Sequence, residues 1–150
     1  MKPIHSFLFS TLSGILLILS WPATGGLTPL LFIALVPLMW ADLNHTKGKF
    51  FWYANWTLLL FNFGSTWWVW NASSFGAVAA ILLNALFTTL IYLAARFTRL
   101  QLSSKHGYIA LLVYWVAWEY VHHDWDLSWP WLTLGYAFAE RPEWVQWYSY

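Results

Sequence analysis

Glu119 and His122 are the residues of this sequence whose types and spacing best suit chemistry. They lie in the apolar stretch YWVAWEYVHH, where Glu119 is the single acidic residue. An ionisable side chain inside a membrane-spanning helix is costly and usually has a partner. His122 lies one helical turn further on and can supply that partner by a hydrogen bond or, when protonated, by charge. Two interpretations stay open: the pair braces the end of a helix, or it handles a polar headgroup.

The histidines and aspartates that follow do not predict a metal site. His122, His123, Asp124 and Asp126 are close in sequence, but adjacent side chains on a helix diverge, and neither a second ligand cluster nor an HExxH pattern accompanies them. The chain has no cysteine, which excludes a thiolate nucleophile within it. No glycine-rich phosphate loop and no recognisable Ser/His/Asp set is present. These residues by themselves predict no catalytic centre, no metal and no cofactor.

The stretch WPWLTLGYAF, residues 129–138, is too aromatic for an ordinary loop and too short to cross a membrane. Pro130 prevents helix continuation. An amphipathic aromatic patch at the level of the lipid headgroups is expected, made of Trp125, Trp129, Trp131, Tyr136 and Phe138. It is either an interfacial anchor or the mouth of a lipid-binding cavity.

Composition places these residues in a membrane protein. The chain is 60% hydrophobic and 9% charged, whereas soluble domains are about 45–50% apolar and about 25% charged. Aromatic residues make up 22%, with 14 Trp, as in the aromatic belts of membrane interfaces. The net charge of +1 and the absence of a Lys/Arg run argue against a nucleic-acid partner.

We expect an all-α fold, a polytopic transmembrane bundle of about five helices that forms one domain over residues 1–150. The second helix is short and contains Pro37, so it is kinked or only dips into the bilayer. The expected segments are Ile4–Trp21, Leu27–Ala41, Phe50–Trp70, Phe75–Phe97 and Tyr108–His123.

The first segment has a rival interpretation as a signal peptide, because Lys2 precedes an apolar run. A small-x-small cleavage site is missing and further apolar segments follow, which favours an uncleaved helix. Retention of basic residues on the cytoplasmic side then predicts a cytoplasmic N-terminus. Six basic residues would be cytoplasmic and Arg141 would be outside; the six are Lys2, Lys47, Lys49, Arg96, Arg99 and Lys105.

Two helices carry stripes of small and polar residues. The stripe on the third helix contains Asn55, Leu58, Asn62 and Ser65, and that on the fourth contains Ala77, Ala80, Asn84 and Thr88. Such stripes let transmembrane backbones approach and form hydrogen bonds. They indicate helix packing or, alternatively, the lining of a lipid-facing cleft.

The stretch WEYVHHDWDLSWPWLTLGYAFAERPEWVQW resembles a segment of bacterial apolipoprotein N-acyltransferases. Its fairly specific element is Pro-Trp-Leu-x-x-Gly-Tyr, at Pro130–Tyr136. SWPATGGLTPLLFIALVPLMWA is similar to the family's first outer loop and second helix, and FFWYANWTLLLFNFGSTWWVWNASSFG to its third helix. Order and spacing agree over nearly the whole chain.

The resemblance implies an enzyme of the bacterial cytoplasmic membrane that has a membrane bundle and an outer nitrilase-like domain. It implies acyl transfer from a phospholipid, through a cysteine thioester, to the N-terminal amino group of a diacylglyceryl-modified apolipoprotein. The catalytic Glu, Lys and Cys would lie downstream of Tyr150, so the chain alone is expected to be inactive. The implied substrate-binding residues are Trp129, Trp131, Gly135, Tyr136, Glu119 and His122.

His122 stands where the family often has arginine, so a permanent ion pair with Glu119 is replaced by a charge that depends on pH. A second hypothesis is a small integral membrane scaffold or partner subunit without catalysis. The ending EWVQWYSY is similar to the start of another apolar segment. We therefore expect that the sequence is cut at this end. The first hypothesis predicts that the chain continues into the nitrilase-like domain, and the second that it stops at Tyr150.

Overall fold

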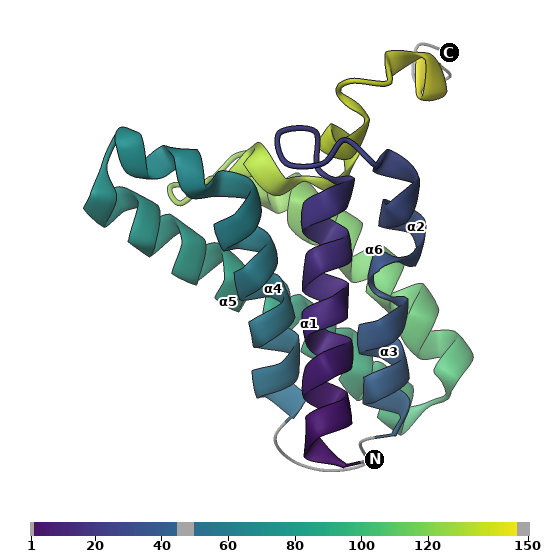
Figure 1. The fold of residues 1–150 in the computed structure, drawn as a ribbon. Coiled ribbons are helices and arrows are strands. Elements are labelled where there is room, and N and C mark those ends of the chain that lie inside the picture. Colours follow the sequence, from purple (N-terminus) through teal and green to yellow (C-terminus); the bar gives the residue numbers. More distant parts are fainter. Residues whose placement is uncertain (1, 45–49, 147–150) are drawn as a thin grey trace. The chain divides into compact units, whose positions relative to one another are not determined.

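The computed structural model describes residues 2–44 and 50–146, and within these ranges the chain forms helices and no strand. The structure divides into two compact groups, residues 1–67 with 131–150, and residues 68–130. The predicted all-α class is confirmed. In chain order the elements are α1 (Pro3–Ser20), η1 (Thr28–Leu30), α2 (Leu31–Ala34), α3 (Val36–Leu43), α4 (Phe50–Thr66), η2 (Trp67–Asn71), α5 (Ser74–Gln101), α6 (Ser104–His122), η3 (Pro130–Leu132), η4 (Leu134–Phe138) and η5 (Pro142–Trp144), the η elements being 3₁₀ helices (Figure 1).

Each expected apolar segment contains a helix. Among the described residues, α1 and α5 are long and apolar enough to cross a membrane, and Thr28–Leu43 is a shorter apolar stretch. The expected kink in that stretch is confirmed: α2 ends at Ala34 and α3 restarts at Val36. Pro37 lies in the first turn of α3, where its missing N–H costs least, whereas within a continuous helix its ring would clash with the carbonyl of Ile33.

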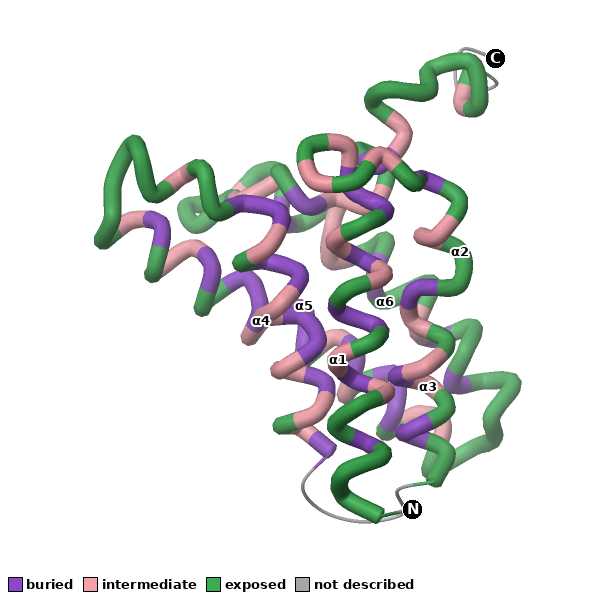
Figure 2. Tube along the Cα trace, viewed as in Figure 1, coloured by how far each residue is buried: buried purple, intermediate pink, exposed green. Residues whose placement is uncertain are grey.

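The inward face of α1 is built from small residues. Its buried positions are Ser6, Ser10, Ser13, Gly14, Leu17 and Ser20, while Ile4, Leu8 and Ile15 are exposed. Figure 2 shows buried and exposed positions along α1. This distribution is the reverse of a soluble helix, which buries its apolar stripe. Small inward residues and apolar outward residues are typical of helices that pack against one another in lipid.

Hydroxyl groups on α1 and α4 form bonds to neighbouring backbone. Thr57 donates its hydroxyl proton to the carbonyl oxygen of Ser10 at 2.8 Å. The Leu38 N–H donates to the Ser13 hydroxyl, also at 2.8 Å. Leu38 lies in the first turn of α3, where backbone N–H groups have no partner within the helix. Ser13 therefore stabilises the helix restart that Pro37 makes necessary.

The second group is a hairpin of α5 and α6, and both helices begin at serine caps. Ser73 accepts a hydrogen bond from the Gly76 N–H at 3.1 Å, and Ser103 accepts one from the His106 N–H. Such caps satisfy N–H groups of the first turn. A turn at Leu102 and Ser103 reverses the chain, and α6 then packs against α5.

The predicted polar stripes are largely buried. On α4, Leu58, Asn62 and Ser65 are buried and Asn55 is half-buried. The stripe on α5 is equally enclosed: Ala77, Asn84 and Thr88 are buried and Ala80 is half-buried. Threonines on both helices donate to their own preceding turn, as Thr66 does to the Asn62 carbonyl at 2.7 Å. These threonine hydroxyl groups are therefore paired without water.

Gly107 sets the separation of α5 and α6. A Cβ added there would lie 2.2 Å from the Arg99 Cβ and 2.8 Å from its Cα. Because these atoms cannot move without the backbone, we expect Gly107→Ala to destabilise the hairpin by roughly 1–3 kcal/mol, the usual cost of overpacking. Thermal unfolding followed by circular dichroism in detergent measures the loss. Gly135→Ala is the matched control, because a Cβ there meets nothing within 4 Å; equal midpoints for the two variants would contradict the close contact.

Candidate functional site

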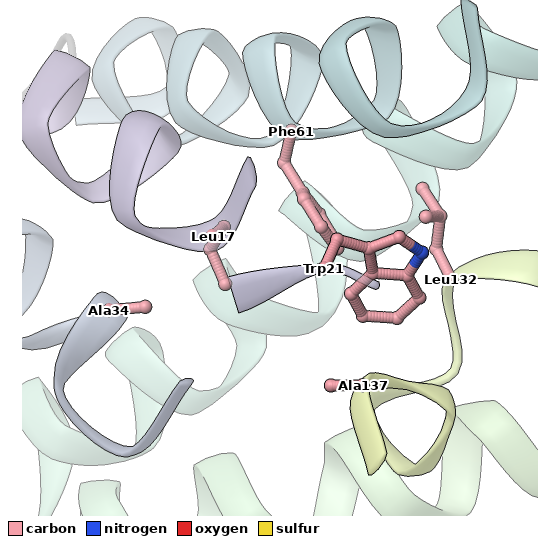
Figure 3. Close-up of a cluster of buried hydrophobic side chains, with 6 residues drawn as sticks. All are labelled: Leu17, Trp21, Ala34, Phe61, Leu132 and Ala137. Atoms are coloured by element: carbon pink, nitrogen blue, oxygen red, sulfur yellow. The ribbon is translucent and has the colours of Figure 1, made fainter. Parts of the chain in front are cut away.

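The aromatic segment of the first group is anchored by Leu132 and Ala137, and Phe138 packs against the same cluster. Leu132 and Ala137 are buried in one cluster with Leu17, Trp21, Ala34 and Phe61 (Figure 3). Trp21 and Phe61 meet edge to face with ring centroids 5.1 Å apart. The buried Thr28 hydroxyl donates to the Ala137 carbonyl at 2.9 Å. These contacts fix the backbone of η4 on the end of α1.

With this backbone fixed, the predicted binding residues of the segment lie at the surface. Trp131 is 52% exposed and Tyr136 is 45% exposed. Gly135 is exposed as well, and open space surrounds the position of an added Cβ. Large rings held on a rigid support offer apolar contact at little conformational cost. The arrangement suits contact with a lipid chain.

In the second group, Glu119 and His122 are hydrogen-bonded to different indoles. The indole N–H of Trp115 donates to Glu119 Oε1 at 2.9 Å, one turn back along α6. The indole N–H of Trp125 donates to His122 Nδ1 at 2.8 Å. The expected bond between Glu119 and His122 thus gives way to two aromatic partners. The His122 bond ties the end of α6 to the following loop, whereas the Glu119 bond stays within α6.

Aromatic rings enclose the imidazole of His122, which is 6% exposed. Trp118 stacks on it with centroids 4.7 Å apart and an interplanar angle of 24°. Trp125 lies against its edge, and Phe87 of α5 contacts both indoles, at 5.4 Å from Trp118 and 5.5 Å from Trp125. The imidazole is therefore a rigid part of the hairpin.

A pocket of about 210 Å³ lies beside His122, between α5 and the loop that follows α6. Alanine, leucine and phenylalanine side chains form most of its wall. Its polar lining residues are Asn84, His122, Ser128 and Trp129. The structure therefore brings two of the predicted binding residues, His122 and Trp129, to one cavity, while Glu119 is not part of its lining.

The predicted site residues belong to different groups of the fold. Trp131, Gly135 and Tyr136 lie in the first group, and Trp129, Glu119 and His122 in the second. Sequence reasoning missed Trp115, Trp118 and Phe87, although the spacing of Trp115 from Glu119, and of Trp118 from His122, was a usable signal for one helix face. Within the described ranges, no group of three or more His, Cys, Asp or Glu side chains could hold a metal ion.

Comparisons with known proteins agree with this architecture. Residues 13–150 match the family model described as "Apolipoprotein N-acyltransferase N-terminal domain". The chain is 34% identical over 134 residues to an apolipoprotein N-acyltransferase of Chlorobaculum tepidum, an alignment that covers 86% of this chain and 25% of that protein. The chain therefore spans about a quarter of this curated relative. No solved structure matches the chain significantly.

The family model covers nearly all of the sequence, including both helical groups and the aromatic segment between α6 and the C-terminal residues. The identity to the Chlorobaculum tepidum protein extends over most of the same residues. The chain belongs to the apolipoprotein N-acyltransferase family and corresponds to its N-terminal domain.

Proposed function

We propose that this chain is the membrane part of an enzyme that transfers an acyl chain from a phospholipid to the N-terminal amino group of a diacylglyceryl-modified apolipoprotein. The match of residues 13–150 to the N-terminal domain of this family carries the proposal. The chain contains no cysteine, so a thioester intermediate requires a catalytic domain outside it. The 150-residue chain by itself is accordingly inactive.

The proposed location is the bacterial cytoplasmic membrane, with several crossings and a cytoplasmic N-terminus. The apolar outward face of α1 supports this, because only 33% of that span is buried, and only 39% of the span in α5. A core helix of a soluble protein would be mostly buried. Lys47 and Lys49, which contribute to the predicted orientation, lie outside the described residues.

Within this membrane part, the proposed role of the aromatic segment is to admit lipid substrates from the outer leaflet. Trp131 and Tyr136 are exposed while Leu132 and Ala137 hold the backbone. A rim of rigid rings accepts acyl chains without leaving backbone polar groups in hydrocarbon. Trp129, Gly135, Glu119 and His122 complete the proposed set, with Gly135 leaving open space beside the rings.

The orientation of the chain in the membrane is tested by introducing single cysteines, because the chain has none of its own. We expect Asp126→Cys to react with a membrane-impermeant maleimide in intact spheroplasts, because it lies on the proposed outer side. Gln101→Cys, exposed at the opposite end of the hairpin, should react only after permeabilisation. The reverse labelling pattern would rule out the proposed orientation.

The role of Trp131 is tested in the protein extended by its catalytic domain. We expect Trp131→Ala to lower N-acylation about tenfold through lost apolar contact, and Trp131→Phe to keep most of it. Mass spectrometry of N-terminal lipopeptides measures the added acyl chain. Trp70→Ala, another exposed tryptophan, is the matched control, and the unextended chain is the negative control. Full activity of Trp131→Ala, or activity of the unextended chain, would refute the proposal.

Glu119 distinguishes bracing from a direct charge effect. Glu119→Gln keeps an oxygen that can accept from the Trp115 indole, so bracing predicts unchanged stability and N-acylation. Glu119→Leu leaves that buried donor unpaired, and we expect it to lower the free energy of unfolding by about 1–3 kcal/mol. Denaturation in detergent and the lipopeptide assay measure the two effects. Loss of N-acylation in a stable Glu119→Gln protein would show that the carboxylate charge itself is needed.

A further inference from the structure

The pocket beside α5 contains a hydrogen-bond donor whose position is fixed and which forms no well-aligned hydrogen bond. An indole N–H can only donate, so the bond from Trp125 to His122 Nδ1 requires this nitrogen to carry no proton. The proton of the neutral ring is then on Nε2. Nε2 is buried and forms no hydrogen bond of acceptable geometry, although the Trp129 backbone is near the ring.

A second unpaired donor lines the same pocket. The indole Nε1 of Trp129 is buried and has no hydrogen-bond partner. Buried polar groups in native proteins are nearly always paired, and each exception requires an explanation. Trp125 and Trp118 already occupy the Nδ1 edge and one face of the imidazole, which leaves the Nε2 edge for the pocket. A single acceptor atom held there would pair both N–H groups.

The rest of the lining limits what that ligand can be. No charged side chain lines the pocket, so a phosphate or carboxylate would be buried without a counter-charge, which is strongly unfavourable. The wall is mostly apolar. A volume of about 210 Å³ is below the roughly 300–1,000 Å³ of pockets that enclose a whole small molecule. The pocket therefore suits one neutral acceptor with a short length of hydrocarbon attached.

We propose that this pocket binds an acyl ester group, whose carbonyl oxygen accepts from His122 Nε2 and Trp129 Nε1 while its first methylenes contact Leu127 and Phe87. The inference rests on the proposed function, which brings glycerol esters to this chain. Two sources share the chemistry, the phospholipid acyl donor and the diacylglyceryl group of the apolipoprotein. The position after α6 would thus hold the ester region of a lipid.

The test compares the binding of an ester with that of the corresponding ether analogue, which lacks the carbonyl group. The ¹⁵N-labelled 150-residue chain in maltoside detergent, which has no ester, is titrated with dioctanoylglycerol or with dioctyl glyceryl ether. We expect the ester, and not the ether, to shift the indole N–H resonance of Trp129, which is assigned by its absence in Trp129→Phe. Equal shifts with both probes, or no shift with either, would overturn the proposal.

Variants separate donor loss from general disruption. We expect Trp129→Phe to weaken ester binding about three- to tenfold, the range for one hydrogen bond, and Trp70→Phe to leave it unchanged. His122→Gln retains an N–H donor and should keep part of the preference for ester over ether, whereas His122→Leu should not. Equal ester binding by Trp129→Phe and the unmodified chain would contradict the inference.

Titration with a dioctanoyl phospholipid and with a diacylglyceryl-cysteine peptide identifies the source of the ester. The natural ester is the one that shifts the indole N–H resonance of Trp129 at the lower concentration. If neither shifts it, the proposal is overturned. This binding assay uses the chain alone, whereas N-acylation is measured on the extended protein. Ester binding by the chain without N-acylation by the extended protein would overturn the proposed function, while the proposed ester site would stand. N-acylation by the extended protein without ester selectivity at Trp129 would support the proposed function and overturn the proposed ester site.

Discussion

Close packing through the small-residue face of α1 is the constraint on which the first helical group depends. The small residues Ser10, Ser13 and Gly14 let α3 and α4 approach α1 closely. The Ser13 hydroxyl accepts a hydrogen bond from the backbone of α3, and the Ser10 carbonyl accepts one from a threonine of α4, so these groups are paired without water. Leu17 at the end of this face then joins the cluster that contains Trp21. The platform that fixes Leu132 and Ala137 is therefore a consequence of how α1 packs, and the exposed rings of Trp131 and Tyr136 depend on it in turn.

In the second group, indole N–H groups hold the side chains of Glu119 and His122. Trp115 pairs with Glu119 and Trp125 pairs with His122. This gives a physical reason for histidine at a position where the resemblance leads one to expect arginine. A neutral imidazole can accept the Trp125 N–H at Nδ1, whereas a guanidinium has no acceptor atom and would leave that indole unpaired. The exchange also keeps the pocket lining free of permanent charge.

The aromatic segment serves the two groups differently, and the change occurs at Pro130. Trp129 belongs with the hairpin and lines its pocket, while Trp131 belongs with the cluster at the end of α1. Pro130 cannot continue a preceding helix, because it lacks an N–H and has a fixed φ, but it can begin a new one, as it does for η3. The short motif is thus two structural pieces in one stretch of sequence, one in each helical group.

The helical class, the positions of the apolar segments, the break near Pro37 and the family could all be predicted from the amino-acid sequence, because apolar length, proline stereochemistry and a specific motif are local properties. The burial of Asn62 and Asn84 also followed from helical spacing. The hydrogen-bond partners of Glu119 and His122 could not be predicted in this way, since spacing shows which residues share a helix face and not which of several neighbours forms the bond. The same reason applies to the pocket: its unpaired donors depend on side-chain orientations that packing of α5, α6 and the following loop imposes.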